Sequence, residues 1–227
     1  MVIEYKSCHK CSSQNIVKNG SNNVGNPKYK CKDCGFGGVF ETKRKSEDFK
    51  EMVIRAAQDR NSARGSARVF EISHQTVLRW VKKKAQTLPE IAKSLLKWEK
   101  GDVLELDELW SFVYCKAFKR WIWIALCRRT RQVVAYFMGD RSAQSCQALW
   151  DLTPDDYKKS HTFSDFWEAY GKVMDSGKHQ MVGKDSGQTH HVERWNCTLR
   201  QRVCRFVRKT LSFSKTEEMH EIYLKLF

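Results

Sequence analysis

Residues 102–114 read Asp-Val-Leu-Glu-Leu-Asp-Glu-Leu-Trp-Ser-Phe-Val-Tyr, and this apolar stretch predicts a β-strand. Successive side chains of a strand point to opposite faces, so Leu104 and Leu106 are expected on one side. Glu105 and Asp107 are then expected on the other side. Carboxylates inside an apolar strand are costly to bury unless they are paired or bind a metal. The stretch therefore predicts both a central strand and a site of chemistry.

Strands and helices alternate after this strand. Two further strands, 120–127 and 132–138, are separated by short polar turns, as in an antiparallel meander. The remaining elements are a helix over 142–152, a strand over 161–165, a helix near Trp167, a strand near 179–182 and a long helix from about His191. This order predicts the α/β class with a mixed sheet.

Three carboxylates lie at the ends or centres of these elements. Asp107 is within the first strand, Asp165 ends the fourth, and Glu193 stands at the start of the last helix. If the fold brings them together, their hard oxygens suit Mg²⁺ or Mn²⁺ and two-ion phosphoryl transfer. Glu105 is the reserve candidate, and Glu108 is expected to point away. Each acid also has a simpler interpretation: a surface charge for Glu108, a helix N-terminal acid for Glu193.

The cysteines predict a metal site near the N-terminus. Cys8-x2-Cys11 and Cys31-x2-Cys34 have the spacing of a four-thiolate site, most often zinc. A segment of this size cannot bury enough core to fold alone, so zinc would supply the missing stability. Iron fits the same spacing, and disulfides are less consistent with a chain that shows no secretory signal. The other five of the nine cysteines are expected to be small apolar side chains in a reducing cytosol.

Helical periodicity begins at Ser46 and continues to about residue 86. A helix over about 62–70 and a second from Ser73 to about Lys84 predict a helix-turn-helix unit that binds DNA. Glu71 occupies the turn position that favours glycine, and Ser66 a position that is usually apolar. The expected base contacts are Gln75 and Arg79, and the expected phosphate contacts are Lys82, Lys83 and Lys84. An ordinary helical hairpin with a basic exposed face is the alternative.

These patterns predict four parts of the chain. They are a zinc-ribbon module over 1–45, a helix-turn-helix module over 46–86, a linker over 87–101 and an α/β catalytic domain over 102–227. The linker is predicted to be a helix from Pro89 to Lys100, with Pro89 at its first position and Gly101 after its end.

Charge is distributed unevenly along the chain. Lys and Arg number 41 against 26 Asp and Glu in 227 residues, a formal charge of +15. Residues 1–100 carry a net +11, residues 101–193 a net −1 and residues 194–227 a net +5. This uneven pattern suggests a polyanion as partner, although solvated charged faces are the better explanation on charge alone. The longest apolar run is seven residues, Trp121–Cys127, too short to cross a bilayer. A cytoplasmic protein associated with the nucleoid is expected.

Several motifs resemble those of insertion sequence one transposases. The cysteine pairs and Ser73-His74-Gln75-Thr76-Val77-Leu78-Arg79-Trp80 resemble the N-terminal part of that family. Its catalytic part is similar to Leu106-Asp107-Glu108-Leu109-Trp110, Ser164-Asp165-Phe166-Trp167, His191-Val192-Glu193-Arg194-Trp195-Asn196-Cys197-Thr198-Leu199-Arg200-Gln201 and Lys209-Thr210-Leu211-Ser212-Phe213-Ser214-Lys215. The resemblance implies an RNase H-like fold and a catalytic triad of Asp107, Asp165 and Glu193.

The resemblance further implies a transposase that cuts the ends of its element and joins them to target DNA. Six basic residues and no acid lie between Arg194 and Lys209, so the last helix is expected to face DNA, with Asn196 and Arg200 as contacts. For the other basic residues of this stretch, a solvated basic helix is an equal alternative. A homo-oligomer assembled on double-stranded DNA is expected. Two alternatives remain: an RNase H-like nuclease without strand transfer, and an inactive or regulatory DNA-binding relic.

Overall fold

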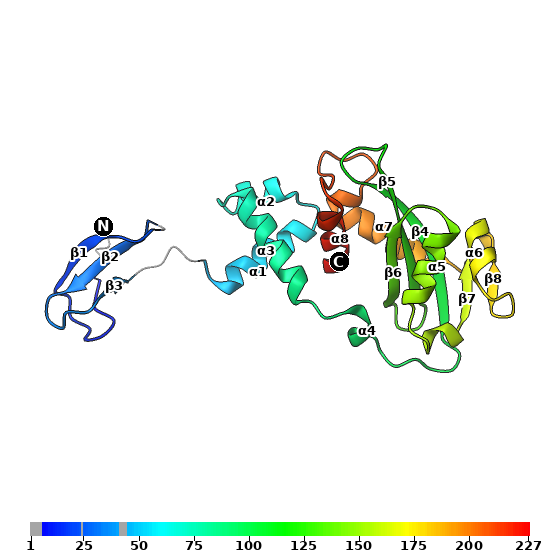
Figure 1. Ribbon diagram of the computed structural model, residues 1–227, viewed down its shortest axis with the longest axis horizontal. Coiled ribbons are helices and arrows are strands. Elements are labelled where there is room, and N and C mark those ends of the chain that lie inside the picture. The colour runs from blue at the N-terminus through cyan, green and yellow to red at the C-terminus, as the bar shows by residue number, and fades with distance from the viewer. Residues whose placement is uncertain (1–5, 24, 41–44) are drawn as a thin grey trace. The chain divides into compact units, whose positions relative to one another are not determined.

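The computed structural model describes residues 6–23, 25–40 and 45–227. The chain forms two compact units, residues 1–50 and residues 51–227 (Figure 1). No helix in the described part of the chain is long and apolar enough to span a membrane.

The first unit is a small antiparallel sheet. Its strands are β1 (Ile16–Ser21), β2 (Pro27–Cys31) and β3 (Gly37–Val39), in the order β1-β2-β3. Among the described residues of this unit, the buried cluster consists of Cys8, Cys31, Tyr29 and Phe40, with Ile16 and Cys34 partly buried against it. Such a small core cannot by itself offset the conformational entropy of folding.

Three helices follow where the sequence predicts them: α1 (Glu47–Gln58), α2 (Ala63–Val69) and α3 (His74–Thr87). The hydroxyl of Ser62 caps α2 by accepting from the Gly65 N–H, and that of Ser73 caps α3 by accepting from the Thr76 N–H. Glu71, between α2 and α3, has a φ of 52°, the left-handed conformation for which glycine is preferred. Ser66 is fully buried, and its hydroxyl has no hydrogen-bond partner among the described residues.

The predicted linker helix is wrong for most of its length. Only α4 (Ile91–Ser94) is helical, because the chain after it is held extended by contacts with the sheet. The Leu96 N–H donates to Gln132 Oε1 over 2.9 Å, and its carbonyl accepts from the Tyr157 hydroxyl over 2.7 Å. The Trp98 indole donates to Ser160 Oγ over 2.9 Å. Leu95 and Trp98 pack on buried side chains instead of lining one helical face.

A five-stranded mixed sheet forms the centre of the second unit, in the order β6-β5-β4-β7-β8. β4 (Val103–Phe112), β5 (Lys119–Cys127) and β6 (Val133–Gly139) are an antiparallel meander. β7 (His161–Ser164) and β8 (His179–Met181) run parallel to β4. The α/β class and the mixed sheet predicted from the sequence are therefore confirmed.

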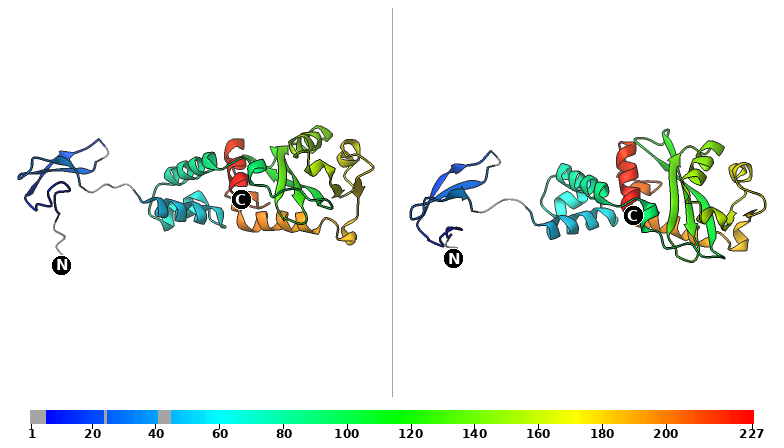
Figure 2. Two further views of the ribbon diagram at one scale, coloured as in Figure 1. Left: turned by 90° about the horizontal axis from the view of Figure 1, so that it is seen from below. Right: turned by 60° about the horizontal axis from the view of Figure 1, so that its bottom comes forward.

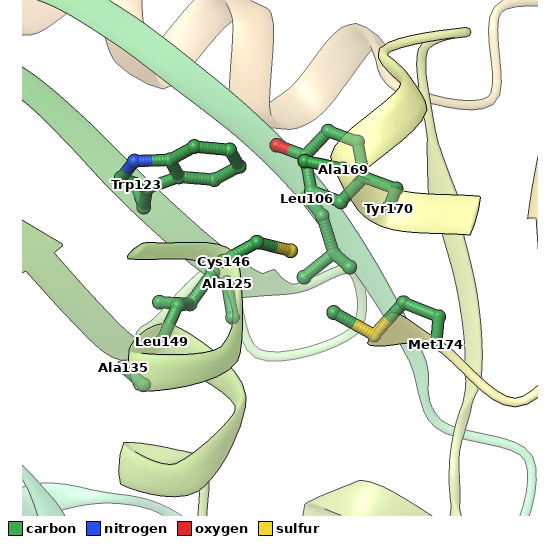
Figure 3. Packing of buried hydrophobic residues seen from close by; sticks show 9 residues of the cluster. All are labelled: Leu106, Trp123, Ala125, Ala135, Cys146, Leu149, Ala169, Tyr170 and Met174. Carbon is green, nitrogen blue, oxygen red and sulfur yellow. The ribbon is translucent and has the colours of Figure 1, made fainter. Parts of the chain in front are cut away.

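Helices cover both faces of this sheet (Figure 2). α5 (Ala143–Leu152) and α6 (Glu168–Val173) lie on one face, and α7 (His190–Arg202) lies on the other, against β4 and β5. Figure 3 shows the core between the sheet and α5 and α6, formed by Leu106, Trp123, Ala125, Ala135, Cys146, Leu149, Ala169, Tyr170 and Met174. Single 3-10 turns span Tyr157–Lys159, Lys184–Ser186 and Cys204–Phe206.

The final helix, α8 (Glu217–Leu226), was not among the predicted elements. The Thr216 hydroxyl caps it by accepting from the Met219 N–H, and its buried face carries His220, Tyr223 and Leu224. An ion pair of 2.5 Å joins Lys82 of α3 to Glu218 of α8. The helices before the sheet thus contact the C-terminal helix directly.

Candidate active site and cysteine cluster

The candidate active site lies where pairing between two parallel strands ends. β7 pairs with β4 only at Val103–Glu105 of β4, and its last residue is Ser164. Asp107 lies just past the paired part of β4, and Asp165 follows β7 directly. Because the strands are parallel, their carboxyl ends meet at one edge and the two aspartates come together. Ligand oxygens of Asp107, Asp165 and Glu108 lie within 4.8 Å of one another.

Asp107 is held by groups from its own strand and from α7. Its Oδ2 accepts from Asn196 Nδ2 over 2.7 Å, and its Oδ1 accepts from the Glu108 N–H over 2.9 Å. Burial, together with the carboxylates of Glu108 and Asp165, raises the pKa of Asp107 to about 7, and the two hydrogen bonds oppose this shift. Oδ1 of Asp165 accepts from the Trp167 N–H over 3.0 Å.

Glu108 is a member of the carboxylate cluster, so its interpretation as a surface charge is wrong. It projects to the α6 face, opposite Asp107, as strand alternation requires, and it is 8% exposed. Its Oε1 accepts from Arg141 at 2.9 Å and 2.5 Å, and its Oε2 accepts from the Tyr170 hydroxyl at 2.9 Å. Its carboxylate reaches Asp165 because β7 has ended there and no strand separates the two faces. Burial raises the pKa of Glu108 despite Arg141.

Arg141 and Tyr170 are site residues that sequence reasoning missed. The guanidinium of Arg141 lies 4.5 Å from the ring centroid of Trp121 and 3.8 Å from that of Trp167. Cation–π contacts with both rings hold it against Glu108. No local spacing signals this arrangement, since the residues come from separate elements.

Glu193 lies in the exposed first turn of α7. Its Oε1 accepts from the Thr189 hydroxyl over 3.0 Å, and it is not part of the carboxylate cluster found among the described residues. Asn196, which bonds Asp107, is three residues further along and therefore on the same helix face. The structure thus brings Asp107 and Asp165 together and places Glu193 one turn from Asn196, which contacts Asp107.

Glu105 has a structural role, so its place as reserve ligand is corrected. It is fully buried, and its Oε2 accepts from the N–H groups of His191 and Val192 over 2.9 Å and 3.0 Å. Its Oε1 contacts His191 Nδ1 at 2.6 Å and Arg128 Nε at 2.8 Å. Thr189, at the N-cap of α7, makes no capping bond. Glu105 therefore supplies the cap from β4, and Arg128 already compensates its charge.

The two residues of α7 that we expected to contact DNA make contacts within the protein. Asn196 is buried, and its Oδ1 has no partner among the described residues. Arg200 donates to the carbonyls of Phe206 and Trp110 over 2.9 Å and 2.8 Å. Burial lowers the pKa of Arg200 to about 10. A phosphate would compete with both carbonyls, so in this structure Arg200 anchors α7.

On α3, three of the five predicted DNA contacts point into solvent: Gln75, Arg79 and Lys83 are exposed. Lys84 forms an ion pair of 3.0 Å with Glu51, as Lys82 does with Glu218. These two lysines therefore have carboxylate partners within the chain.

The four predicted cysteines of the first unit converge. Cys8 and Cys34 have their sulfurs 3.6 Å apart, as do Cys11 and Cys31, and all four lie within 4.8 Å of one another. Ligands of a tetrahedral zinc with bonds of about 2.3 Å are separated by roughly 3.8 Å. The cluster is therefore compatible with zinc.

The mixed sheet and its three clustered carboxylates define an α/β protein with an acidic site at the carboxyl end of parallel strands. Residues 103–227 match the family described as IS1 transposase. The insertion element iso-IS1n protein InsB of Shigella dysenteriae is 40% identical over 126 residues, which are 55% of this chain and 92% of that protein. Insertion element IS1 protein InsB of Shigella flexneri is 35% identical over 117 residues, 52% of this chain and 86% of that protein. The chain belongs to the IS1 transposase family.

Proposed function

We propose that the protein cuts the ends of its own insertion element and joins them to target DNA by metal-dependent phosphoryl transfer. The observation that carries this proposal is the convergence of Asp107 and Asp165 beside α7. The sheet order, an antiparallel meander followed by two strands parallel to β4, supports an RNase H-like fold for residues 102–227. Membership of the IS1 transposase family supports the substrate, double-stranded DNA.

The carboxylate site fits Mg²⁺ or Mn²⁺. Its donors are hard carboxylate oxygens, which these ions prefer. Arg141 compensates the charge of Glu108, whereas no salt bridge with a described residue compensates Asp107 or Asp165, so the cluster has carboxylates available to a cation. Two such ions, when bound, would activate the attacking oxygen and stabilise the leaving one.

The protein's own residues have separate tasks in this proposal. Asp107 and Asp165 hold the metals, and Glu193, one helical turn before Asn196, completes the ligand set. Asn196 fixes the orientation of the Asp107 carboxylate through its hydrogen bond. Glu105 fixes the start of α7, which carries both Glu193 and Asn196. Positioning of ligands by such supporting contacts is typical of metal sites.

DNA binding is assigned to the N-terminal parts of the chain. The helix-turn-helix formed by α2 and α3 would place α3 in the major groove, with Gln75 and Arg79 on base edges and Lys83 on a phosphate. Lys82 and Lys84 can contact phosphates only if their ion pairs with Glu218 and Glu51 break when DNA binds. Structural zinc on Cys8, Cys11, Cys31 and Cys34 would fold the first unit. A homo-oligomer would hold the two element ends together.

The test is a cleavage and joining assay with the full chain, Mg²⁺ or Mn²⁺, and a plasmid that carries this gene with its bordering DNA. Asp107→Asn, Asp165→Asn and Glu193→Gln are expected to abolish both steps while DNA binding persists. Asp155→Asn is the matched control, because Asp155 is an exposed acid whose ion pair in the described part of the chain is with Lys158.

Three other outcomes would contradict the proposal in different ways. Cleavage without joined products would identify a nuclease. DNA binding without cleavage by the wild type would identify a DNA-binding relic. Full activity of Asp165→Asn would exclude the carboxylate site as the catalytic centre.

A further inference from the structure

An open cavity of about 340 Å³ adjoins Asp165, and no residue of α7 is among those that line it. Its volume is at the small end of the range for ligand pockets, roughly 300–1,000 Å³. The side chains that the argument uses are those of Arg141, Asp165, Phe166, Trp167 and Lys184. Aromatic and basic groups therefore lie together beside a candidate metal ligand.

Phe166 is the unusual member of this lining. It follows Asp165 directly in the chain, yet it is 69% exposed, so folding gains little from its ring. One edge of the ring lies against the backbone of Gly183, where an added Cβ would be 3.7 Å from Phe166 Cε2. The ring is thus supported from one side and open on the other, as an aromatic platform for a flat ligand would be.

The charges around the ring suit a nucleotide. Lys184 is exposed and forms no ion pair with any residue that the structure describes. Arg141 is held between Trp121 and Trp167 and forms an ion pair with Glu108. Its guanidinium therefore adds positive potential to the cavity from a fixed position. An aromatic face next to a free cation is the arrangement by which proteins bind unpaired nucleotides: the base stacks and the phosphate meets the cation.

We propose that this cavity holds one unpaired nucleotide of the DNA end, with its base on Phe166 and its phosphate near Lys184. The inference rests on the proposed function, which puts the scissile phosphate at Asp107 and Asp165. The nucleotide next to that phosphate must then lie beside Asp165, where the cavity is. Extruding a base from a duplex costs the free energy of its stacking and pairing, and stacking on an aromatic side chain offsets part of this loss.

Binding to DNA tests the site independently of catalysis. The probe is a fluorescent duplex carrying the DNA that borders this gene, with its terminal base pair either matched or mismatched. The full chain is used, and EDTA is added in this measurement to prevent cleavage. Its concentration is kept too low to remove zinc bound by thiolates. Wild type is expected to bind the mismatched end more tightly, because no pairing has to be broken. Phe166→Ala should lose this preference, Phe166→Trp should keep it, and Phe118→Ala, which removes another exposed ring elsewhere, should not change it.

Cleavage with Mg²⁺ provides the second measurement. Phe166→Ala is expected to cleave the matched end about tenfold more slowly than wild type, or slower still, and the mismatched end should recover most of the lost rate. An equal loss on both ends, or an unchanged preference in binding, would overturn the nucleotide site and leave the proposed function standing. If wild type cleaved neither duplex, the proposed function would fail, and the binding measurement would still decide the site.

Discussion

Asn196 of α7 donates a hydrogen bond of 2.7 Å to the carboxylate of Asp107 in the central strand. The two residues are 89 positions apart in the chain, and their bond ties the helix that carries Glu193 to the strand that carries the first aspartate. Because this bond favours the ionised form of Asp107, it opposes the burial that raises the pKa of the carboxyl group.

Asn196→Ala is expected to reduce strand cleavage much more than it reduces stability. Loss of one hydrogen bond should lower the free energy of unfolding by about 1 kcal/mol, whereas Asp107 would lose the contact that orients it. Cleavage rates at several Mg²⁺ concentrations and urea unfolding measure the two effects. Gln201→Ala, on the exposed end of the same helix, is the control. Unchanged cleavage in Asn196→Ala would contradict a positioning role.

Glu105→Gln is expected to destabilise the second unit by about 3 kcal/mol, because it leaves Arg128 and His191 without the buried charge that pairs with them. The cap of α7 would weaken as well, since the backbone N–H groups of His191 and Val192 face a carboxylate in this structure. Chemical unfolding measures the loss. Glu99→Gln removes an exposed partner of Arg129 and should cost below about 1 kcal/mol. Equal effects of the two substitutions would rule out the role of Glu105 in holding the start of α7.

His220 predicts a dependence of stability on pH. It is buried between Ser111 and Ser214, and burial, with Arg205 and Arg120, lowers its pKa to about 4. The unfolded chain, with a pKa near 6.5, binds the proton first, so His220 stabilises the fold fully above about pH 6.5 and this contribution is lost as the pH falls toward 4. The loss should approach about 3 kcal/mol.

Urea unfolding at several pH values checks this expectation. His220→Gln should be less stable than wild type at pH 7.5, and the difference should shrink as the pH falls through the window. A difference that stays constant with pH would show that the pKa of His220 is the same in the folded and the unfolded chain.

Removal of one cysteine ligand is expected to unfold the first unit alone. Cys31→Ser should lower the zinc content from one ion per chain toward zero and expose residues 1–45 to protease, because the core of this unit is so small. Metal analysis and limited proteolysis measure both results, and Cys115→Ser, which alters a cysteine outside the cluster, should change neither. A wild-type chain that contained no stoichiometric metal and yet resisted protease would contradict the zinc site.

Arg79→Ala is expected to weaken binding to the bordering DNA by roughly 1–3 kcal/mol and to relax base preference at one position. The reason is that Arg79 is exposed on α3 and can meet a base edge. Arg55→Ala removes an equally exposed arginine from α1 and should have a smaller effect. Fluorescence anisotropy with cognate and altered duplexes measures the loss of affinity in each variant. Equal losses in Arg79→Ala and Arg55→Ala would mean that α3 does not recognise the base sequence.

The sequence alone determined the local structure, because that structure depends on neighbouring residues. Periodicity placed the three helices before residue 88 and all five strands of the sheet, and Ser73, three residues before the helical N–H that it caps, marked the start of α3. The spacing of Cys8, Cys11, Cys31 and Cys34 predicted their convergence, since each pair forms one knuckle.

Tertiary structure alone decided which acids share the site. Alternation sends Glu105 toward α7 and Glu108 toward α6, but it does not reveal that β7 ends beside Asp107, which lets Glu108 reach Asp165. Nor does it reveal that Glu105 meets the start of a helix 86 residues away. The prediction of a helix over the whole linker was wrong for the same reason. Its apolar residues suggest a helix, yet contacts with Gln132, Tyr157 and Ser160 favour an extended chain. Strand register and long-range contacts, which no local pattern encodes, select among the conformations that the sequence allows.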